Sequence, residues 1–351
     1  MNRRRFLSIG GLAAVIAGVW LARPPGANEP SAAATNAGSS SAAGAVAALR
    51  TPWGDPDLQG IWSGGYILTP LERPDRFAEK EFLTDEDVAV LEREAALTFG
   101  VGAGAGRLPR PARGTEADVG GAYNDVFAGR GTKVVRSKRS SLIVDPGNGK
   151  IPPLTADGQK RAAVSLTTNF ASAGGRADGP EDRPRDDRCF GVSLPVAFGH
   201  PATAGAYSRI VQAPGTISIY YEQNRGGSYR MIFLDGRPHL SRGIRQWLGD
   251  SRGRWEGQTL VVDTTNFTDR TNYYGSRENL HLVERFTRVA ADVITYAVTI
   301  DDSTTFTRPW TIELPLTRAD EKKNQIYENA CHEGNYALTN ILAGARTKEQ
   351  D

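Results

Sequence analysis

The chain has 351 residues, of which 39% are hydrophobic, so it can bury a core in one large domain or two smaller ones. It carries 42 basic and 40 acidic residues, which gives a formal net charge of +2. Proteins that bind nucleic acids place a basic stripe along the phosphates, and this sequence contains no such stripe. We therefore predict no nucleic-acid partner.

Residues 1–30 have the layout of a secretory signal, with a basic start, an apolar stretch and small residues near Ala27. Arg3 and Arg4 precede a variable residue and Phe-Leu, which is the twin-arginine pattern of proteins exported after folding. The alternative is a transmembrane anchor, but the apolar stretch is shorter than the ~20 residues that cross a bilayer. We predict export to the periplasm, with no transmembrane anchor once the signal is cleaved; whether it is cleaved stays open.

Residues 31–50 are dominated by Ala, Ser, Gly and Asn and contain too few large apolar side chains to offset the entropy lost on ordering. We predict a disordered tether there. A single β-rich domain is expected over residues 51–346, with a short tail over residues 347–351. The part of this domain before Tyr207 is irregular and partly helical in pattern.

The clearest helix signal covers residues 82–97. Thr84 can cap the first turn, and the acidic residues 85–87 suit the positive end of a helix dipole. Apolar side chains then recur at helical spacing at Val88, Leu91 and Ala95. The pattern predicts an amphipathic helix inserted in the β-rich domain.

From Tyr207 onward, short segments rich in β-branched and aromatic residues are separated by Gly, Asp, Asn or Pro. They cover residues 208–223, 228–240, 254–267, 280–289, 292–300 and 309–316, and a first short strand is expected near residues 58–63. Few helical segments lie between them, which favours a mainly β fold, an antiparallel barrel or sandwich, over a parallel α/β fold. A further hairpin is predicted from residues 140–145 into residues 151–154.

Residues 237–258 form a long connection crowded with charged and aromatic side chains. One interpretation is plain turns, with Trp255 plugging the core. The other is a loop over the mouth of a barrel, where aromatic walls and a few polar groups suit a small organic ligand. The candidate binding residues are His239, Trp247 and Trp255 in this loop, with Glu222 and Arg285 on other predicted strands.

Two separate segments supply candidates for acid–base chemistry. In the strand predicted over residues 280–289, regular alternation places His281 and Glu284 on opposite faces, so a bulge would be needed for both to enter one pocket. His332 and Glu333 precede a glycine that permits a sharp turn back toward the sheet. We predict that His281, Glu284, His332 and Glu333 belong to one pocket. The catalytic candidates are these four residues together with Asp250 and Arg252.

Within that pocket, Asp250 is expected to orient a histidine. Arg252 or Arg285 is expected to stabilise a developing oxyanion. A carboxylate or imidazole with a tuned pKa is sufficient for elimination, hydration or isomerisation, so no redox cofactor is required.

Cys189 and Cys331 are the two cysteines of the chain. In an oxidising compartment a disulfide is the natural pairing, and the alternative is a free Cys331 that acts as a nucleophile or metal ligand. A metalloprotease-type site needs a second histidine after His332 and Glu333, and none follows at that spacing. We predict a disulfide, no metal and no cofactor; a zinc or other divalent ion held by distant His and Glu residues stays an open alternative.

The motifs of the chain resemble those of an uncharacterised family of exported, signal-bearing bacterial proteins. The residues that carry the resemblance are TPWGDPDLQGIW, LDGRPH, GDSRGRWEG, TLVVDTTNF, LHLVERFTR, TRPWT and YENACHEGNY, in this order from Thr51 onward. The resemblance implies no particular chemistry. In addition, LQGIW and GRWEG are similar to the Gly-x-Trp element of lipocalin-like barrels, which implies a fold of the lipocalin or calycin kind.

Two functions of different classes follow. The first is an exported enzyme of lyase, hydratase or isomerase type, acting on a small, partly apolar or sugar-like molecule. The second is a non-catalytic periplasmic protein in which the same barrel binds a small molecule and the charged residues pair with one another. The sequence does not decide the substrate or the oligomeric state.

Overall fold

A computed structural model describes most of the chain that follows the predicted tether. The described residues are 49–64, 67–99, 133–164, 177–183, 188–189, 194, 207–222, 228–271, 273–323, 326 and 330–349. The predicted signal and nearly all of the predicted tether lie outside these ranges. In the described part, no helix is long and apolar enough to cross a membrane.

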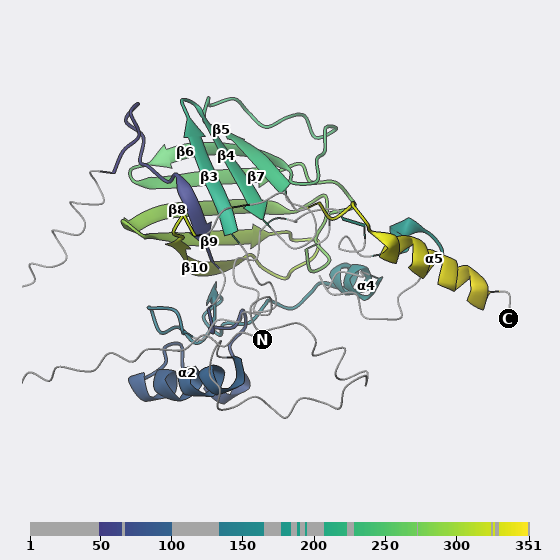
Figure 1. The fold of residues 1–351 in the computed structure, drawn as a ribbon, viewed down its shortest axis with the longest axis horizontal. Helices are drawn as coiled ribbons and strands as arrows, with labels where there is room; N and C mark the ends of the chain where they lie inside the picture. Colours follow the sequence, from purple (N-terminus) through teal and green to yellow (C-terminus); the bar gives the residue numbers. More distant parts are fainter. Residues whose placement is uncertain are drawn as a thin grey trace, which may run out of the picture.

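The described residues form ten strands in one sheet (Figure 1). The strands are β1 (Gly60–Ser63), β2 (Ile143–Asp145), β3 (Tyr207–Ala213), β4 (Thr216–Glu222), β5 (Ser228–Phe233), β6 (Asp250–Glu256), β7 (Thr259–Thr265), β8 (His281–Ala290), β9 (Val293–Asp301) and β10 (Trp310–Arg318). The prediction of a mainly β fold is confirmed.

The sheet closes into a barrel. Strands β1 and β3 to β10 pair in the order β1-β3-β4-β5-β6-β7-β8-β9-β10, and β10 pairs again with β1 through Trp62 and Arg318. β2 adds to the other end of β10, where Ile143 lies opposite Ile312. The predicted hairpin from residues 140–145 into residues 151–154 is therefore wrong, because the backbone of β2 is paired with β10 instead.

All neighbouring strands are antiparallel except β5 and β6, which are parallel. Two parallel strands cannot be joined by a tight hairpin, so residues 234–249 must cross over before β6 begins. β6 starts at Asp250, which makes a strand of residues that the sequence predicts partly as loop.

Alternation along the strands separates an apolar interior from an outer face. On β4, Ile217, Ile219 and Tyr221 are buried, while the residues between them are partly exposed. The buried positions of neighbouring strands lie opposite one another and form a single core inside the ring. A position in phase with these residues therefore points inward.

The helices lie outside the barrel: Figure 1 shows α2 and α4 below the strands and α5 to one side. They comprise α2 (Asp85–Phe99), α4 (Ala156–Val164), α5 (Tyr336–Lys348) and the short 3-10 turns η1 (Asp75–Phe77) and η2 (Pro180–Asp182). α2 confirms the helix predicted near residues 82–97. Thr84 Oγ1 accepts a hydrogen bond from the Asp87 amide at 3.1 Å, and the Asp87 carboxylate accepts one from the Thr84 amide at 3.0 Å, so the two residues cap the helix reciprocally.

Cys189 and Cys331 form a disulfide with a Cα–Cα distance of 5.5 Å, which confirms the predicted pairing. α5 follows shortly after this bridge and extends to Lys348, so it includes residues that the sequence predicts as tail. Arg346 donates hydrogen bonds to the carbonyl oxygens of Ala177 and Asp178, at 3.0 and 2.9 Å. The C-terminal helix is thus held to the segment that precedes Cys189.

Candidate functional site

The barrel wall separates the candidates of β8. His281 lies on the outer face and its side chain is 37% exposed, whereas Glu284 points inward and its side chain is 1% exposed. No bulge interrupts the strand between them, because Leu282, Val283 and Glu284 keep regular partners on β9. Each side of the wall therefore has its own group of polar residues.

Inside the barrel, Glu284 is bound by two residues that the sequence analysis did not select. Arg230 of β5 donates from Nη1 to Glu284 Oε2 at 2.7 Å and from Nη2 to Oε1 at 2.8 Å. Tyr296 of β9 donates its hydroxyl to Oε1 at 2.9 Å, and Ser251 Oγ lies 3.4 Å from Arg230 Nη1. We call these four residues, Arg230, Ser251, Glu284 and Tyr296, the inner network.

The inner network is electrostatically coupled. Burial acts to lower the pKa of Arg230, but the charge and hydrogen bonds of Glu284 together with Tyr221 and Tyr296 outweigh it and the net pKa is raised. Burial and the same carboxylate raise the pKa of Tyr296 well above its usual value, so its hydroxyl stays protonated and donates. The guanidinium carbon of Arg230 also lies 5.9 Å from the ring centroid of Tyr221.

The sequence does contain a signal for Arg230. In SYRMIF, Arg230 alternates in phase with Ile232, which is fully buried. An arginine on the apolar face of a strand requires a buried acidic partner, and Glu284 alternates in the same way with Leu282 and Phe286. The pairing of these two residues across the barrel depends on closure, which alternation alone does not reveal.

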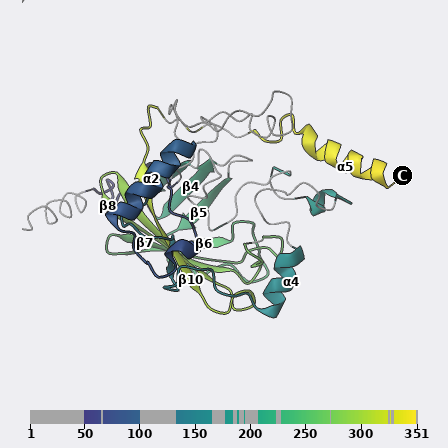
Figure 2. The ribbon, with the colours of Figure 1, turned by 90° about the horizontal axis from the view of Figure 1, so that it is seen from below.

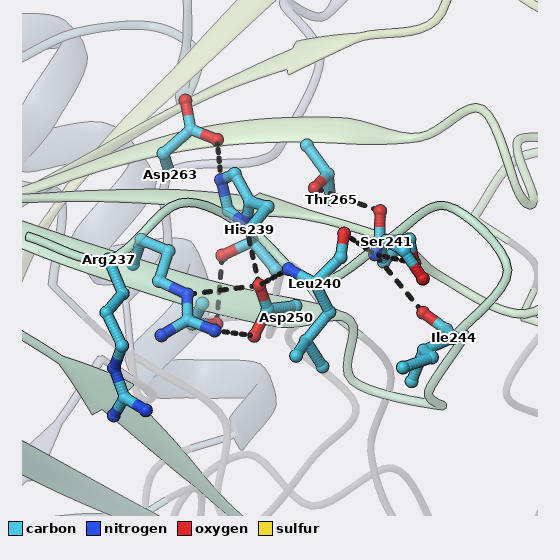
Figure 3. Close-up of polar contacts among 12 residues, drawn as sticks. Arg237, His239, Leu240, Ser241, Ile244, Asp250, Asp263 and Thr265 are labelled. Atoms are coloured by element: carbon cyan, nitrogen blue, oxygen red, sulfur yellow. Dashed lines mark hydrogen bonds and ion pairs between the residues drawn. The ribbon is translucent and has the colours of Figure 1, made fainter.

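On the outer face, a second group of polar side chains joins β6, β7 and β8 to residues 234–249. His281 Nε2 lies 3.0 Å from Asp263 Oδ2, and Asp263 Oδ1 lies 2.8 Å from His239 Nε2. His239 Nδ1 lies 2.8 Å from Asp250 Oδ2. We call His281, Asp263, His239, Asp250 and Arg252 the outer chain; Figure 3 shows His239 between the two carboxylates.

Asp250 is the buried end of the outer chain, with a side chain that is 4% exposed. Its carboxylate accepts hydrogen bonds from Arg252 at 3.1 and 3.0 Å and from the Leu240 amide at 3.1 Å, besides facing His239. Burial acts to raise the pKa of Asp250, but these donors outweigh it and the net pKa is lowered. The structure thus brings Asp250, Arg252 and His239 together.

The other end of the outer chain is partly solvated. The hydrogen bond to Asp263 raises the pKa of His281 against the opposing effect of burial, and the charges of Asp263 and Asp301 add to the rise. Burial acts to raise the pKa of Asp263, yet its bonds to His281 and His239 lower the net value. Asp263 was missed because it follows three consecutive buried residues, so alternation along β7 gives no sign of its histidine partners.

Asn266, which follows β7 and is not part of the outer chain, also holds residues 234–249 against the barrel. The side-chain amide of Asn266 donates to the carbonyl oxygens of Leu240, Ser241 and Ile244, at 2.9 to 3.1 Å. The Gln246 amide donates to the Asn266 carbonyl at 2.9 Å. This connection therefore lies along the outer face of β6 and β7.

His332 and Glu333 are exposed and lie in the turn before α5, which projects away from the barrel (Figures 1 and 2). The four proton-transfer candidates are thus not brought into one site: His281 is in the outer chain, Glu284 is in the inner network, and the other two lie in this turn. Among the described residues, no group of three or more His, Cys, Asp or Glu side chains is placed to hold a metal ion.

The remaining binding candidates are distributed over both faces. Trp255 lies opposite Leu260 and packs against the core. Arg285 points outward and donates to Glu256 Oε2 at 2.8 Å. Glu222 and Trp247 are partly exposed, and the Trp247 carbonyl accepts a hydrogen bond from Thr271 Oγ1 at 3.1 Å.

No protein-family model and no curated protein matches this sequence. Partial likeness is found to three solved structures: the REP1-NXSQ fatty acid transporter, a Schistosoma mansoni fatty acid binding protein in complex with arachidonic acid, and a mutant of the fluorescent protein UnaG. Their sequence identities are 11%, 11% and 12%, with TM-scores of 0.22, 0.21 and 0.23. The matches cover 33%, 33% and 39% of this chain and 71%, 71% and 87% of theirs. This likeness assigns no family.

Proposed function

We propose that this protein is a non-catalytic, small-molecule-binding protein, and that the interior of its barrel holds a small, partly apolar organic ligand. The supporting observation is the inner network, which puts a charged pair and a tyrosine hydroxyl inside a closed ring of strands. A ring of about eight strands is just wide enough to be filled by side chains or to hold one small ligand. Binding of this kind needs no metal or cofactor.

Stability alone gives a weak reason for the inner network. Removing two charges from water costs several kcal/mol per ion, and buried ion pairs are frequently replaced by apolar side chains of similar volume with no loss of stability. The other inward positions of β8 and β9 are mainly apolar, such as Leu282, Phe286, Val298 and Ile300. If the inner network recognises a polar group on a mainly apolar ligand, its presence among apolar inward residues is explained.

The test is a titration of the purified protein with N-phenyl-1-naphthylamine, an uncharged dye whose fluorescence rises in apolar surroundings. We expect saturable binding. Val298 lies opposite Glu284 and points inward, so Val298→Phe is expected to block the dye; Ala297, one residue earlier, points outward, so Ala297→Phe is the matched control. Absence of saturable binding, or equal binding by a folded Val298→Phe variant, contradicts the proposal.

We further propose that the protein works in the periplasm. The support is the Arg3–Arg4 pair and the apolar stretch that follows it in the sequence. A periplasmic location also provides the oxidising conditions in which the Cys189–Cys331 disulfide persists.

A further inference from the structure

Three buried N–H groups belong to residues at inward strand positions and have no hydrogen-bond acceptor among the described residues. They are Nε of Arg230, Nε1 of Trp255 and Nε1 of Trp310. Register places each on an inward position: Trp255 lies opposite Leu260, Trp310 lies opposite Ile300, and Arg230 alternates with Ile232. All three are donors, so the groups that would satisfy them are hydrogen-bond acceptors.

The charge of Arg230 is already balanced. Both of its Nη atoms are bound to Glu284, whose Oε1 accepts a second bond from Tyr296. A ligand carboxylate that reached Arg230 would bring a second negative charge beside Glu284 in a region removed from water. Two carboxylates at one guanidinium repel each other, and one would have to take up a proton to remain there.

From these two observations we propose that the ligand of the barrel is an uncharged acceptor, such as an ester, a ketone or another carbonyl compound with an apolar chain, and not a carboxylate. This inference rests on the proposed function and names the ligand class of the same site. The carbonyl oxygen accepts from Nε of Arg230, one of the unpartnered N–H donors, while the Arg230–Glu284 pair stays intact. Glu284 thereby acts as the residue that rejects anionic ligands.

The first experiment compares ligands of matched chain length on the wild-type protein. Methyl decanoate, 2-undecanone and decanoate are each used to displace bound N-phenyl-1-naphthylamine near neutral pH. We expect the ester and the ketone to bind about tenfold more tightly than the acid, since an uncompensated buried charge costs well over the equivalent free energy. Decanoate binding as tightly as the ester, or displacement by none of the three, overturns the inference.

The second experiment changes the charge balance. Glu284→Gln keeps the shape of the side chain but leaves Arg230 without a counter-ion, so decanoate affinity should rise about tenfold while ester affinity changes little. Glu256→Gln is the matched control, because Glu256 pairs with Arg285 on the outer face and the ligand preference should stay that of the wild type. An unchanged preference in folded Glu284→Gln contradicts the role given to Glu284.

The outcomes separate this inference from the proposed function. If the dye itself shows no saturable binding, both fail. If the dye binds and the acid is preferred, the barrel is a binding site of the opposite ligand class and only the inference fails. Circular dichroism of each variant establishes folding, and the wild-type comparison decides the inference if Glu284→Gln does not fold.

Discussion

Asp263 and His281 lie on the outer face of the adjacent strands β7 and β8, with Oδ2 of the carboxylate 3.0 Å from Nε2 of the imidazole. Each stabilises the charged form of the other: the pKa of His281 is raised and that of Asp263 is lowered. His239 faces the second oxygen of Asp263, and Asp301 on β9 adds negative charge near His281. The pair therefore links the stability of the fold to pH.

We predict that His281→Gln destabilises the fold, and that the loss of stability is greatest in mildly acidic solution. A histidine with a raised pKa contributes fully below its usual value of 6.5, and the contribution is lost as pH rises through the folded-state value. Because the pKa of Asp263 is lowered, its stabilising contribution is complete above its usual pKa of 3.8 and is lost as the pH falls further. The difference in free energy of unfolding should be under about 1 kcal/mol, because the pair is partly solvated.

Urea unfolding of wild type and His281→Gln across pH checks this. The difference in free energy of unfolding between wild type and variant should be greatest at pH values between 3.8 and 6.5, the usual pKa values of aspartate and histidine. It should shrink in alkaline solution. A gap that grows with rising pH would reverse the sign and contradict the assigned charges.

The contacts of His239 should hold residues 234–249 against the barrel. Its two ring nitrogens contact Asp250 and Asp263, so His239→Gln removes two contacts to charged groups from this connection. Trypsin cleavage after exposed Arg242 should accelerate on the order of tenfold, because local opening becomes easier. His281→Gln, which leaves both contacts of His239 in place, is the control. Equal rates in both variants would show that the other contacts of the connection, such as those of Asn266, hold it without His239.

The inner pair should be far more sensitive than an exposed one. Arg230→Met strands the buried Glu284 carboxylate and should cost about 3–5 kcal/mol, whereas Arg285→Met removes an exposed pair and should cost less than about 1 kcal/mol. The double change Arg230→Met with Glu284→Leu should recover much of the loss, because no unpaired charge remains. A double variant as unstable as Arg230→Met would indicate that packing, and not the stranded charge, causes the loss.

The strand pattern predicted the faces of the barrel well. Alternation in LHLVERF separated His281 from Glu284, and the structure has them on opposite sides of the wall. The same local rule failed for β2, because two short extended segments near a turn resemble a hairpin even when one of them pairs with a distant strand.

Contacts between residues far apart in the chain could not be predicted from the sequence. The contact of His239 with Asp250 and Asp263 exists because residues 234–249 cross from β5 to a parallel β6, and no local signal distinguishes this from a series of hairpins. Arg230 and Glu284 meet only when the ring closes. Long-range pairings of this kind depend on topology, which period-two patterns do not encode.

Export by the twin-arginine route is tested by changing Arg3 and Arg4 to lysine. On the proposed route this arginine pair is what the export machinery recognises, so the variant precursor should accumulate in the cytoplasm. Fractionation and immunoblotting measure the outcome, with a lysine substitution of Arg5 as the matched control. Unchanged periplasmic levels of the double variant would contradict the twin-arginine route, though not export by another route.

The disulfide encloses nearly the whole barrel, since Cys189 and Cys331 are 142 residues apart and β3 to β10 lie between them. Cross-linking the two ends restricts the unfolded barrel while leaving the folded barrel unchanged. Reduction should therefore lower the free energy of unfolding by between about 2 and 5 kcal/mol, with the upper value given by the chain-entropy model for so long a loop.

Dye binding by the folded protein should remain the same, because neither cysteine belongs to a barrel strand. Urea unfolding and dye titration with and without reductant, together with thiol titration, measure both effects. Equal unfolding midpoints in samples whose two thiols titrate as free would show that the bridge holds only the C-terminal helix and does not constrain the unfolded barrel.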